Sequence, residues 1–158
     1  MLRLLLLISC FSLGEISMAQ PKPKTVVKNT IPGLNGLLTT SGLPYKMVND
    51  SLAVIPYEGN NIKSFQLVVR QISDMYIVLS NLTEAMPGKI GESNYKYLLH
   101  QNNNFDVVKI GISEEDNTVT VRADLYKTGT NAASLKRVIA QVATVTDIIG
   151  GDLNKPNK

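Results

Sequence analysis

The sequence predicts an α+β fold in which an antiparallel sheet of five to six strands carries helices packed on one face. Three observations lead to this prediction. Residues 118–126 (TVTVRADLY) alternate apolar and polar side chains, as a strand with one buried and one wet face does. Residues 131–149 repeat apolar side chains at helical spacing. The other strand-like segments come in groups separated by short turn signals, which favours antiparallel pairing with helices gathered on one side.

The first predicted element is a short helix within residues 32–43. Leu34, Leu37 and Leu38 have the i, i+3, i+4 spacing of a helix face, and Gly42 provides a C-terminal stop. Four strands are expected to follow it, at residues 45–48, 51–58, 63–72 and 75–82.

These four strands differ in where they can lie in the sheet. Pro56 has no N–H to donate to a neighbour, so the second strand is predicted to lie at an edge or to contain a bulge. Phe65, Leu67 and Val69 of the third strand share one face. Residues 75–82 are apolar on both faces for part of their length, which predicts a central strand.

The strand pattern breaks at Pro87-Gly88, and a helix is predicted from about Glu92 to Gln101. Its apolar stripe consists of Tyr95, Leu98 and Leu99. The triple asparagine 102–104 suits a helix exit, because asparagine tolerates left-handed backbone conformations. Two strands joined by a charged hairpin loop are expected next, at residues 105–112 and 118–126.

The last predicted element is the amphipathic helix at about 131–149. Asn131 can cap its start, and Gly150-Gly151 is expected to end it. Its apolar positions are Leu135, Val138, Ile139, Val142 and Ile149. The predicted order is therefore helix, three or four strands, helix, two strands, helix.

Residues 1–19 have the pattern of an export signal, which predicts a periplasmic or secreted protein. Met1-Leu2-Arg3 is a short positive start, Leu4 to Leu13 is an apolar run too short to span a bilayer, and Ser17-Met18-Ala19 has small residues at the cleavage positions. We expect cleavage between Ala19 and Gln20. The alternative is a buried N-terminal helix.

Cys10 offers a second alternative, because Leu7-Ile8-Ser9-Cys10 resembles a lipoprotein cleavage box whose cysteine takes a lipid. With the preferred cleavage, the mature chain has no cysteine, so disulfides and thiol chemistry are excluded. Residues 20–30 are expected to be a flexible linker, residues 31–150 a single α+β domain and residues 151–158 a C-terminal tail. No membrane span is expected in the mature chain.

Composition argues against a nucleic-acid partner. The formal net charge is only +3, and the basic residues are scattered apart from lysines near both ends. The chain has no tryptophan and three phenylalanines, so a base-stacking platform is poorly supplied. Six tyrosines remain as candidates for packing at the sheet margin or for a protein interface, namely Tyr45, Tyr57, Tyr76, Tyr95, Tyr97 and Tyr126.

The supply of catalytic and metal-binding groups is thin. His100 is the only histidine, and it falls near the end of a predicted helix without an obvious orienting neighbour, which favours a structural or surface role. Glu114-Glu115-Asp116 lacks the spacing of a calcium loop and is explained by a hairpin. The other acids considered for paired-carboxylate chemistry are Glu58, Asp74, Glu84 and Asp124. We expect no enzyme, no cofactor and no metal site.

Four segments together resemble the YbjN family of bacterial sensory transduction regulators, whose fold is like that of type III secretion chaperones. They are LLTTSGLPYKMVNDSLAVIPYEG (37–59), FQLVVRQISDMYIVLSNL (65–82), YKYLLHQNNNFDVVKIGISEEDNTVTVRADL (95–125) and the closing helix. In that pattern a helix ends in Gly-Leu-x-Tyr, here Gly42-Leu43-Pro44-Tyr45, and a Leu-Leu helix leads into a strand, a charged turn and an alternating strand.

The resemblance covers most of residues 33–149 and implies a binding module. Chaperones of this fold grip extended segments of partner proteins and often pair as dimers, so a protein or peptide partner and a homodimer are what it implies. Together with the residues, it predicts an exported, non-enzymatic protein that binds its partner through a sheet face or a sheet edge. The alternative is a small-ligand-binding or inhibitory protein of the cell envelope.

Overall fold

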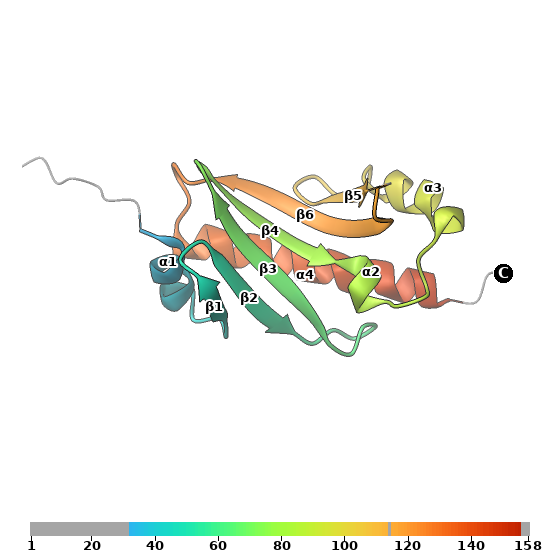
Figure 1. Cartoon of the computed structure of the whole chain (residues 1–158), viewed down its shortest axis with the longest axis horizontal. Coiled ribbons are helices and arrows are strands. Elements are labelled where there is room, and N and C mark those ends of the chain that lie inside the picture. The colour runs from blue at the N-terminus through green and yellow to red at the C-terminus, as the bar shows by residue number, and fades with distance from the viewer. Residues whose placement is uncertain (1–31, 114, 156–158) are drawn as a thin grey trace, which may run out of the picture.

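The computed structural model describes residues 32–113 and 115–155, which form one twisted sheet with a long helix lying across one of its faces (Figure 1). The predicted export signal, Cys10 and the predicted linker lie outside the described residues. The elements in chain order are α1 Leu34–Ser41, β1 Lys46–Asn49, β2 Leu52–Tyr57, β3 Phe65–Ile72, β4 Met75–Asn81, α2 Leu82–Ala85, α3 Glu92–Gln101, β5 Lys109–Ser113, β6 Thr118–Tyr126 and α4 Ala132–Asn154.

The sheet confirms the predicted fold class. Its six strands lie in the order β1-β2-β3-β4-β6-β5, and every neighbouring pair is antiparallel. β4 lies between β3 and β6, as the apolar character of both its faces predicted. β2 lies between β1 and β3 rather than at the edge of the sheet, but its pairing with β1 reaches only to Val54, so Pro56 lies beyond the last partner on that side and needs no N–H there.

The core lies between one face of the sheet, here called the inner face, and helices α1 and α4. Alternate residues of each strand point into it, and α4 packs over β3, β4 and β6 with α1 at its side. The predicted apolar positions of both helices and of β3 are buried. Each large aliphatic side chain removed from water in this way contributes roughly 1.5–3 kcal/mol to the hydrophobic driving force.

Both predicted caps are confirmed. Gly42 adopts a left-handed conformation with φ 70° directly after α1, which a residue with a side chain rarely does. The Asn131 side chain accepts a hydrogen bond from the N–H of Ser134, whose hydroxyl in turn accepts one from the N–H of Asn131. This reciprocal pair sets the start of α4.

The expected end of α4 at Gly150-Gly151 is wrong, because the helix continues through both glycines to Asn154. The glycines mark a close approach of the β2–β3 turn. A Cβ atom at Gly150 would lie 2.4 Å from Ile62 Cγ1, and one at Gly151 would lie 2.7 Å from Asn61 Cγ. The missing side chains let the turn pack directly against the helix.

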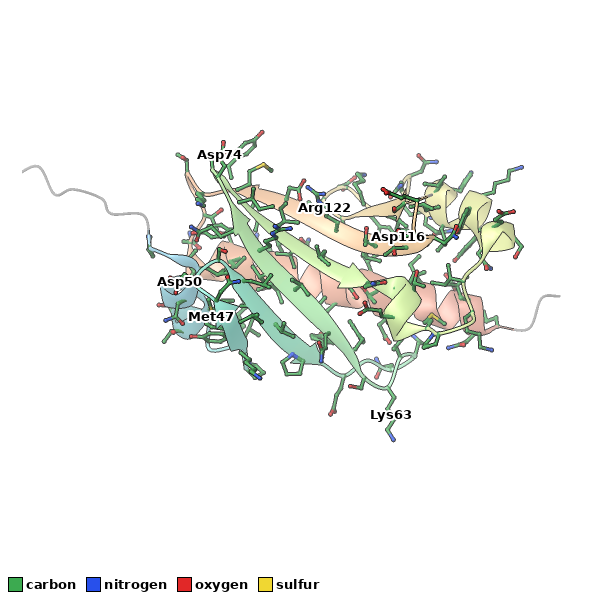
Figure 2. The ribbon with its side chains drawn as sticks, in the orientation of Figure 1. Met47, Asp50, Lys63, Asp74, Asp116 and Arg122 are labelled. Atoms are coloured by element: carbon green, nitrogen blue, oxygen red, sulfur yellow. The ribbon has the colours of Figure 1, made fainter. Side chains whose placement is uncertain are left out.

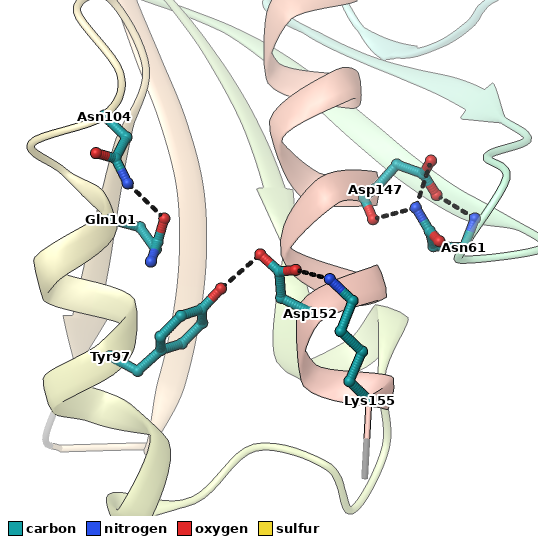
Figure 3. Close-up of polar contacts among 7 residues, drawn as sticks. All are labelled: Asn61, Tyr97, Gln101, Asn104, Asp147, Asp152 and Lys155. Atoms are coloured by element: carbon teal, nitrogen blue, oxygen red, sulfur yellow. Dashed lines mark hydrogen bonds and ion pairs between the residues drawn. The ribbon is translucent and has the colours of Figure 1, made fainter. Parts of the chain in front are cut away.

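Asp147, one turn earlier on α4, fastens the same turn. Its carboxylate accepts hydrogen bonds from the N–H groups of Asn60, Asn61 and Ile62 at 3.0, 2.8 and 2.9 Å. The Asn61 side chain donates to it as well (Figure 3). Gly59 leaves room for this group, since a Cβ there would lie 2.2 Å from Asp147 Oδ1. We call this arrangement the Asp147 clamp.

Several local predictions between β4 and β5 are also corrected. β4 ends at Asn81, whose side chain caps the unpredicted short helix α2. β5 begins only at Lys109, and Leu99 is exposed rather than part of a buried stripe. Asn102 ends α3 with φ −57°, so the left-handed exit expected for the asparagines is wrong there. Its side chain binds β5 instead, as described below.

Candidate functional site

The outer face of the sheet lies opposite α1 and α4, and neither of these two helices covers it. Figure 1 shows α4 behind the sheet and the outer face turned toward the viewer. The strand residues that alternate with the core positions point to this side, and most of them are half-buried or exposed, while Ile77 is buried.

One cross-strand row spans the whole outer face. The register aligns, from β1 to β5, Lys46, Val54, Val68, Leu79, Arg122 and Lys109. The centre of this row is therefore three aliphatic side chains, and both ends are cationic. Directly opposed residues of this kind lie within contact distance of one another, so the three aliphatic side chains form a continuous strip.

Two further rows extend the strip along the strands. In the neighbouring row, Leu52, Arg70 and Ile77 follow one another across β2, β3 and β4, and Asp124 follows on β6. Beyond it Ile72, Met75 and Tyr126 are aligned. Ile72 and Tyr126 are the last residues of β3 and β6, and they are 40% and 67% exposed.

The β5–β6 end of this face is polar and hollowed. Lys109, Gly111, Thr120, Arg122 and Asp124 border a shallow hollow of about 400 Å³. The hollow exists partly because Gly111 has no side chain over the strand. The Arg122 guanidinium donates to both carboxylate oxygens of Asp124, at 2.7 and 2.9 Å, and this bond raises the pKa of Arg122. Figure 2 labels Arg122 on β6.

The outer edge of β5 is partly occupied by a side chain. The Asn102 carboxamide accepts a hydrogen bond from the Ile110 N–H at 2.6 Å and donates one to the Ile110 carbonyl at 3.0 Å. It thus occupies the two Ile110 backbone groups that a further strand would use. Lys109 holds the segment between α3 and β5 in place, since its Nζ donates to Asn102 O and Phe105 O. We call this the Asn102 bridge.

The opposite edge is also a poor template for pairing. β1 has four residues and an irregular register between Met47 and Asn49. Beyond β1, the outer side of β2 contains Pro56, which has no N–H to donate. A further strand would therefore meet an irregular edge at β1 and a partly occupied edge at β5.

A second surface lies on the helix side. The segment Asn104–Val108 and the flank of α4 that carries Arg137, Gln141, Thr144 and Ile148 enclose an open groove of about 480 Å³. Val107 and Ile148 on its walls are 49% and 44% exposed. The groove is lined mainly by apolar side chains, with Arg137 and Asp106 as its charged groups.

The structure does not bring the candidate catalytic residues together. His100 is exposed in the last turn of α3. Glu115 and Asp116 are exposed in the β5–β6 hairpin, while the structure does not describe Glu114. Asp74 and Asp116 lie at opposite ends of the sheet (Figure 2). Within residues 32–113 and 115–155, no three histidines, cysteines or acids are close enough to share a metal ion.

Five of the six tyrosines connect elements or fill the core. Tyr76 is buried, its hydroxyl donates to the Pro32 carbonyl, and burial raises its pKa. Tyr97 on α3 donates to Asp152 on α4 at 2.6 Å (Figure 3). Desolvation raises the pKa of Tyr97, and the bond to the Asp152 carboxylate raises it further. Tyr126 alone among the six is exposed enough to meet a partner.

Sequence reasoning missed the row that gives the outer face its character. Lys46 and Arg122 stand far apart in the chain, and each alternates with apolar neighbours as a residue of any half-buried strand would. The alternation of polar and apolar residues shows that these cations face away from the core, but it does not show which residues of other strands lie beside them. Cross-strand alignment depends on register, which short apolar strands do not specify by themselves.

Comparisons with known proteins identify the fold. No protein-family model and no curated protein matches the chain. YbjN of E. coli is similar to it, with a TM-score of 0.57 and 15% sequence identity over 79% of this chain and 93% of YbjN. The fold is that of YbjN and of type III secretion chaperones.

Two solved complexes give the same result. A chain of the heterodimeric ExoU–SpcU complex from the type III secretion system of Pseudomonas aeruginosa matches with a TM-score of 0.52 and 16% identity, over 78% of this chain and 99% of that chain. A chain of the ExsC–ExsE complex matches with a TM-score of 0.52 and 12% identity, over 73% and 90%. The fold expected from the resemblance is therefore confirmed.

Among the described helices, none is long and apolar enough to cross a membrane.

Proposed function

We propose that this protein is an exported, non-enzymatic protein that binds another protein or a peptide through the outer face of its sheet. The observation that carries the proposal is the uncovered aliphatic strip centred on Val54, Val68 and Leu79. The edges of the sheet offer few backbone groups for pairing with another strand. The open face instead offers apolar side chains, against which another protein can pack.

The comparisons support a protein partner, because the ExsC–ExsE and ExoU–SpcU structures are complexes between two proteins. A second copy of this chain is the first partner to test, by measuring the molecular mass at increasing protein concentration. Nucleic acid is not part of the proposal, since the cations of the outer face flank an apolar strip and Tyr126 is its only aromatic side chain.

Export is supported by the sequence of residues 1–19. Full-length protein carrying a C-terminal tag is expected outside the cytoplasm, with Gln20 as its new N-terminus. N-terminal sequencing after cell fractionation measures both. Retention of Met1 in the cytoplasm would contradict export, and loss of membrane association in Cys10→Ser would show lipidation instead of cleavage at Ala19.

The absence of catalysis is supported by the scattering of reactive groups over the described residues. The acids considered for catalysis lie on different elements, and Asp124 is already bound to Arg122. His100 accordingly has no assigned chemistry, and His100→Ala is expected to leave binding unchanged.

A photo-cross-linking residue tests the binding face directly. Placed at position 68 on β3, it is expected to capture a partner in the native compartment, while the same residue at position 136 on the exposed side of α4 captures none. With the cross-linking residue kept at position 68, the double variant Val54→Thr, Leu79→Thr removes apolar area on both sides of that position but keeps β-branched side chains, so it should fold and lose the cross-link. Equal capture from both positions would contradict the proposal.

The second candidate is a small-ligand-binding protein of the cell envelope, and the groove between Asn104–Val108 and α4 favours it. A small apolar ligand bound there would raise the melting temperature, because it binds only the folded state. Ile148→Asp, on the wall of the groove, would then abolish the shift in a metabolite screen without affecting cross-linking from position 68.

A further inference from the structure

The outer face carries an excess of positive charge. Its strand positions include the cations Lys46, Arg70, Lys109 and Arg122, but only one carboxylate, Asp124. Asp124 is satisfied by Arg122. Neither Lys46 nor Arg70 forms an ion pair with any described residue. The face therefore combines an apolar strip with two cations, Lys46 and Arg70, that have no ion-pair partner among the described residues.

The cations stand at both ends of the strip. Lys46 and Arg122 belong to the same cross-strand row and lie four strands apart, roughly 19 Å at about 4.8 Å per strand. An extended polypeptide covers this distance in about six residues at roughly 3.3 Å per residue. Between the two cations, the row offers only the aliphatic side chains of Val54, Val68 and Leu79.

We propose that the outer face binds a polypeptide segment whose apolar centre is flanked by carboxylates about six residues apart. The inference rests on the proposed function and names the chemistry of its partner. The apolar centre covers the aliphatic strip, one carboxylate reaches Lys46, and the other enters the hollow beside Gly111. A partner with lysines at these two places would bring like charges together, so the arrangement also excludes wrong partners.

The hollow can accept a carboxylate although Arg122 is already paired with Asp124. The bond to Asp124 uses Nε and Nη2 of the guanidinium, and the remaining N–H groups on Nη1 stay available as donors. Lys109 on the neighbouring strand, whose Nζ donates to the carbonyls of Asn102 and Phe105, adds a second positive charge, so the two cations of the hollow outnumber its one carboxylate, Asp124. Thr120 in the floor adds a hydroxyl.

Three labelled heptapeptides test the inference against the full chain. Each has the centre Thr-Leu-Thr-Leu-Thr with one glutamate, one glutamine or one lysine at each end, so that the two end residues are six apart and share the leucine side of an extended chain. In fluorescence anisotropy at low salt, we expect the glutamate peptide to bind at least tenfold more tightly than the glutamine peptide and the lysine peptide to bind weakest. High salt should remove most of the difference, because exposed charges are screened.

Charge reversal on the protein provides the matched control. Lys46→Glu with Arg70→Glu should reverse the order of the peptides. Lys63→Glu with Lys89→Glu changes the net charge equally but lies in exposed loops off the strip, so it should leave the order intact. A twentyfold excess of an oligothymidylate should not displace the glutamate peptide.

The results separate this inference from the proposed function. One outcome is that the wild type binds the glutamate and glutamine peptides equally and the double variant Val68→Thr, Leu79→Thr binds neither. This outcome would overturn the inference and leave the proposed function standing. The inference would also be overturned if Lys63→Glu with Lys89→Glu changed the peptide order as much as Lys46→Glu with Arg70→Glu, or if the oligothymidylate displaced the glutamate peptide. Either result would show that the protein attracts anions without specificity. Binding of none of the peptides overturns it too, and the cross-linking experiment then decides the proposed function.

Discussion

At two places a single polar side chain holds a part of the sheet against a helix, and the two side chains differ in charge. On the β2–β3 side, the Asp147 clamp holds a turn against α4. On the β5 side, the Asn102 bridge holds the end of α3 against the edge strand. Both side chains bind backbone groups of another element, but one is a charged acceptor and the other a neutral group that accepts and donates.

The difference follows from what the backbone presents. The turn directs three consecutive N–H groups, from Asn60, Asn61 and Ile62, at one point, and only a carboxylate can accept all of them. The β5 edge presents the N–H and the C=O of the same residue, Ile110, and a carboxamide matches that pair as a neighbouring peptide group would. An aspartate and an asparagine are therefore not interchangeable at either place.

Charge has a further consequence at the clamp. Burial by itself raises the pKa of Asp147, but the hydrogen bonds from Ile62, Asn61 and Asn60 stabilise the ionised form, and the net pKa lies below its ordinary value of 3.8. The clamp is accordingly sensitive to pH, whereas the Asn102 bridge has no titrating group of its own.

The largest effect is expected from removing the clamp. Asp147→Ala leaves three backbone N–H groups without an acceptor at a partly buried site, and we expect a loss of about 3 kcal/mol in the free energy of unfolding. Urea denaturation followed by circular dichroism measures it. Asp50→Ala, in the exposed β1–β2 turn, is the control and should cost little. A loss below about 0.5 kcal/mol for Asp147→Ala would show that water replaces the carboxylate without cost.

The close packing of the β2–β3 turn against α4 is tested by replacing two helix glycines with alanine. Gly150→Ala gains helix propensity but drives a Cβ into Ile62, and we expect a net loss of about 2 kcal/mol. Gly36→Ala in α1 meets only Pro32 Cβ at an ordinary 3.7 Å, so it should gain about 0.5–1 kcal/mol. The two thermal melts should shift in opposite directions, and a stabilising Gly150→Ala would refute the close approach of the turn.

A smaller and more local effect is expected at the bridge. Asn102→Asp keeps the acceptor for the Ile110 N–H but loses the donor to the Ile110 carbonyl, for a cost of about 1–1.5 kcal/mol. Amide hydrogen exchange should accelerate in β5 while β2 and β3 stay protected. Uniform acceleration throughout the sheet would contradict a role confined to this edge.

The smallest effect is the dependence of the clamp on pH. Because the pKa of Asp147 is lower in the folded than in the unfolded chain, its contribution is complete above the unfolded pKa and is lost as the pH falls through the folded pKa. The stability difference between the wild type and Asp147→Asn should be constant from pH 7 to about 5 and shrink below about pH 4. Asp116 and Asp152, whose pKa values are also lowered, titrate in both proteins and cancel. A difference that grows on acidification would contradict the assignment.

Much of the fold was predictable because its signals are local. Alternation over residues 118–126 identified β6 and its buried face, and the apolar repeat after Asn131 identified α4 and its cap. Two of the mistakes share one cause, since residues that contact another segment can look like breaks in the sequence. Gly150-Gly151 resembles a helix stop, and Asn102 resembles a left-handed exit, until the partner segment is seen.

The candidate site divides in the same way. The sequence by itself determined which side chains of each strand face the core and which face away, because the two-residue period of a strand is a property of the chain alone. Only the tertiary structure decided that Lys46, Val68 and Arg122 stand in one row and that Asp147 reaches a turn about 85 residues away. Register and long-range contacts arise when strands and helices pack together, so no local pattern carries them.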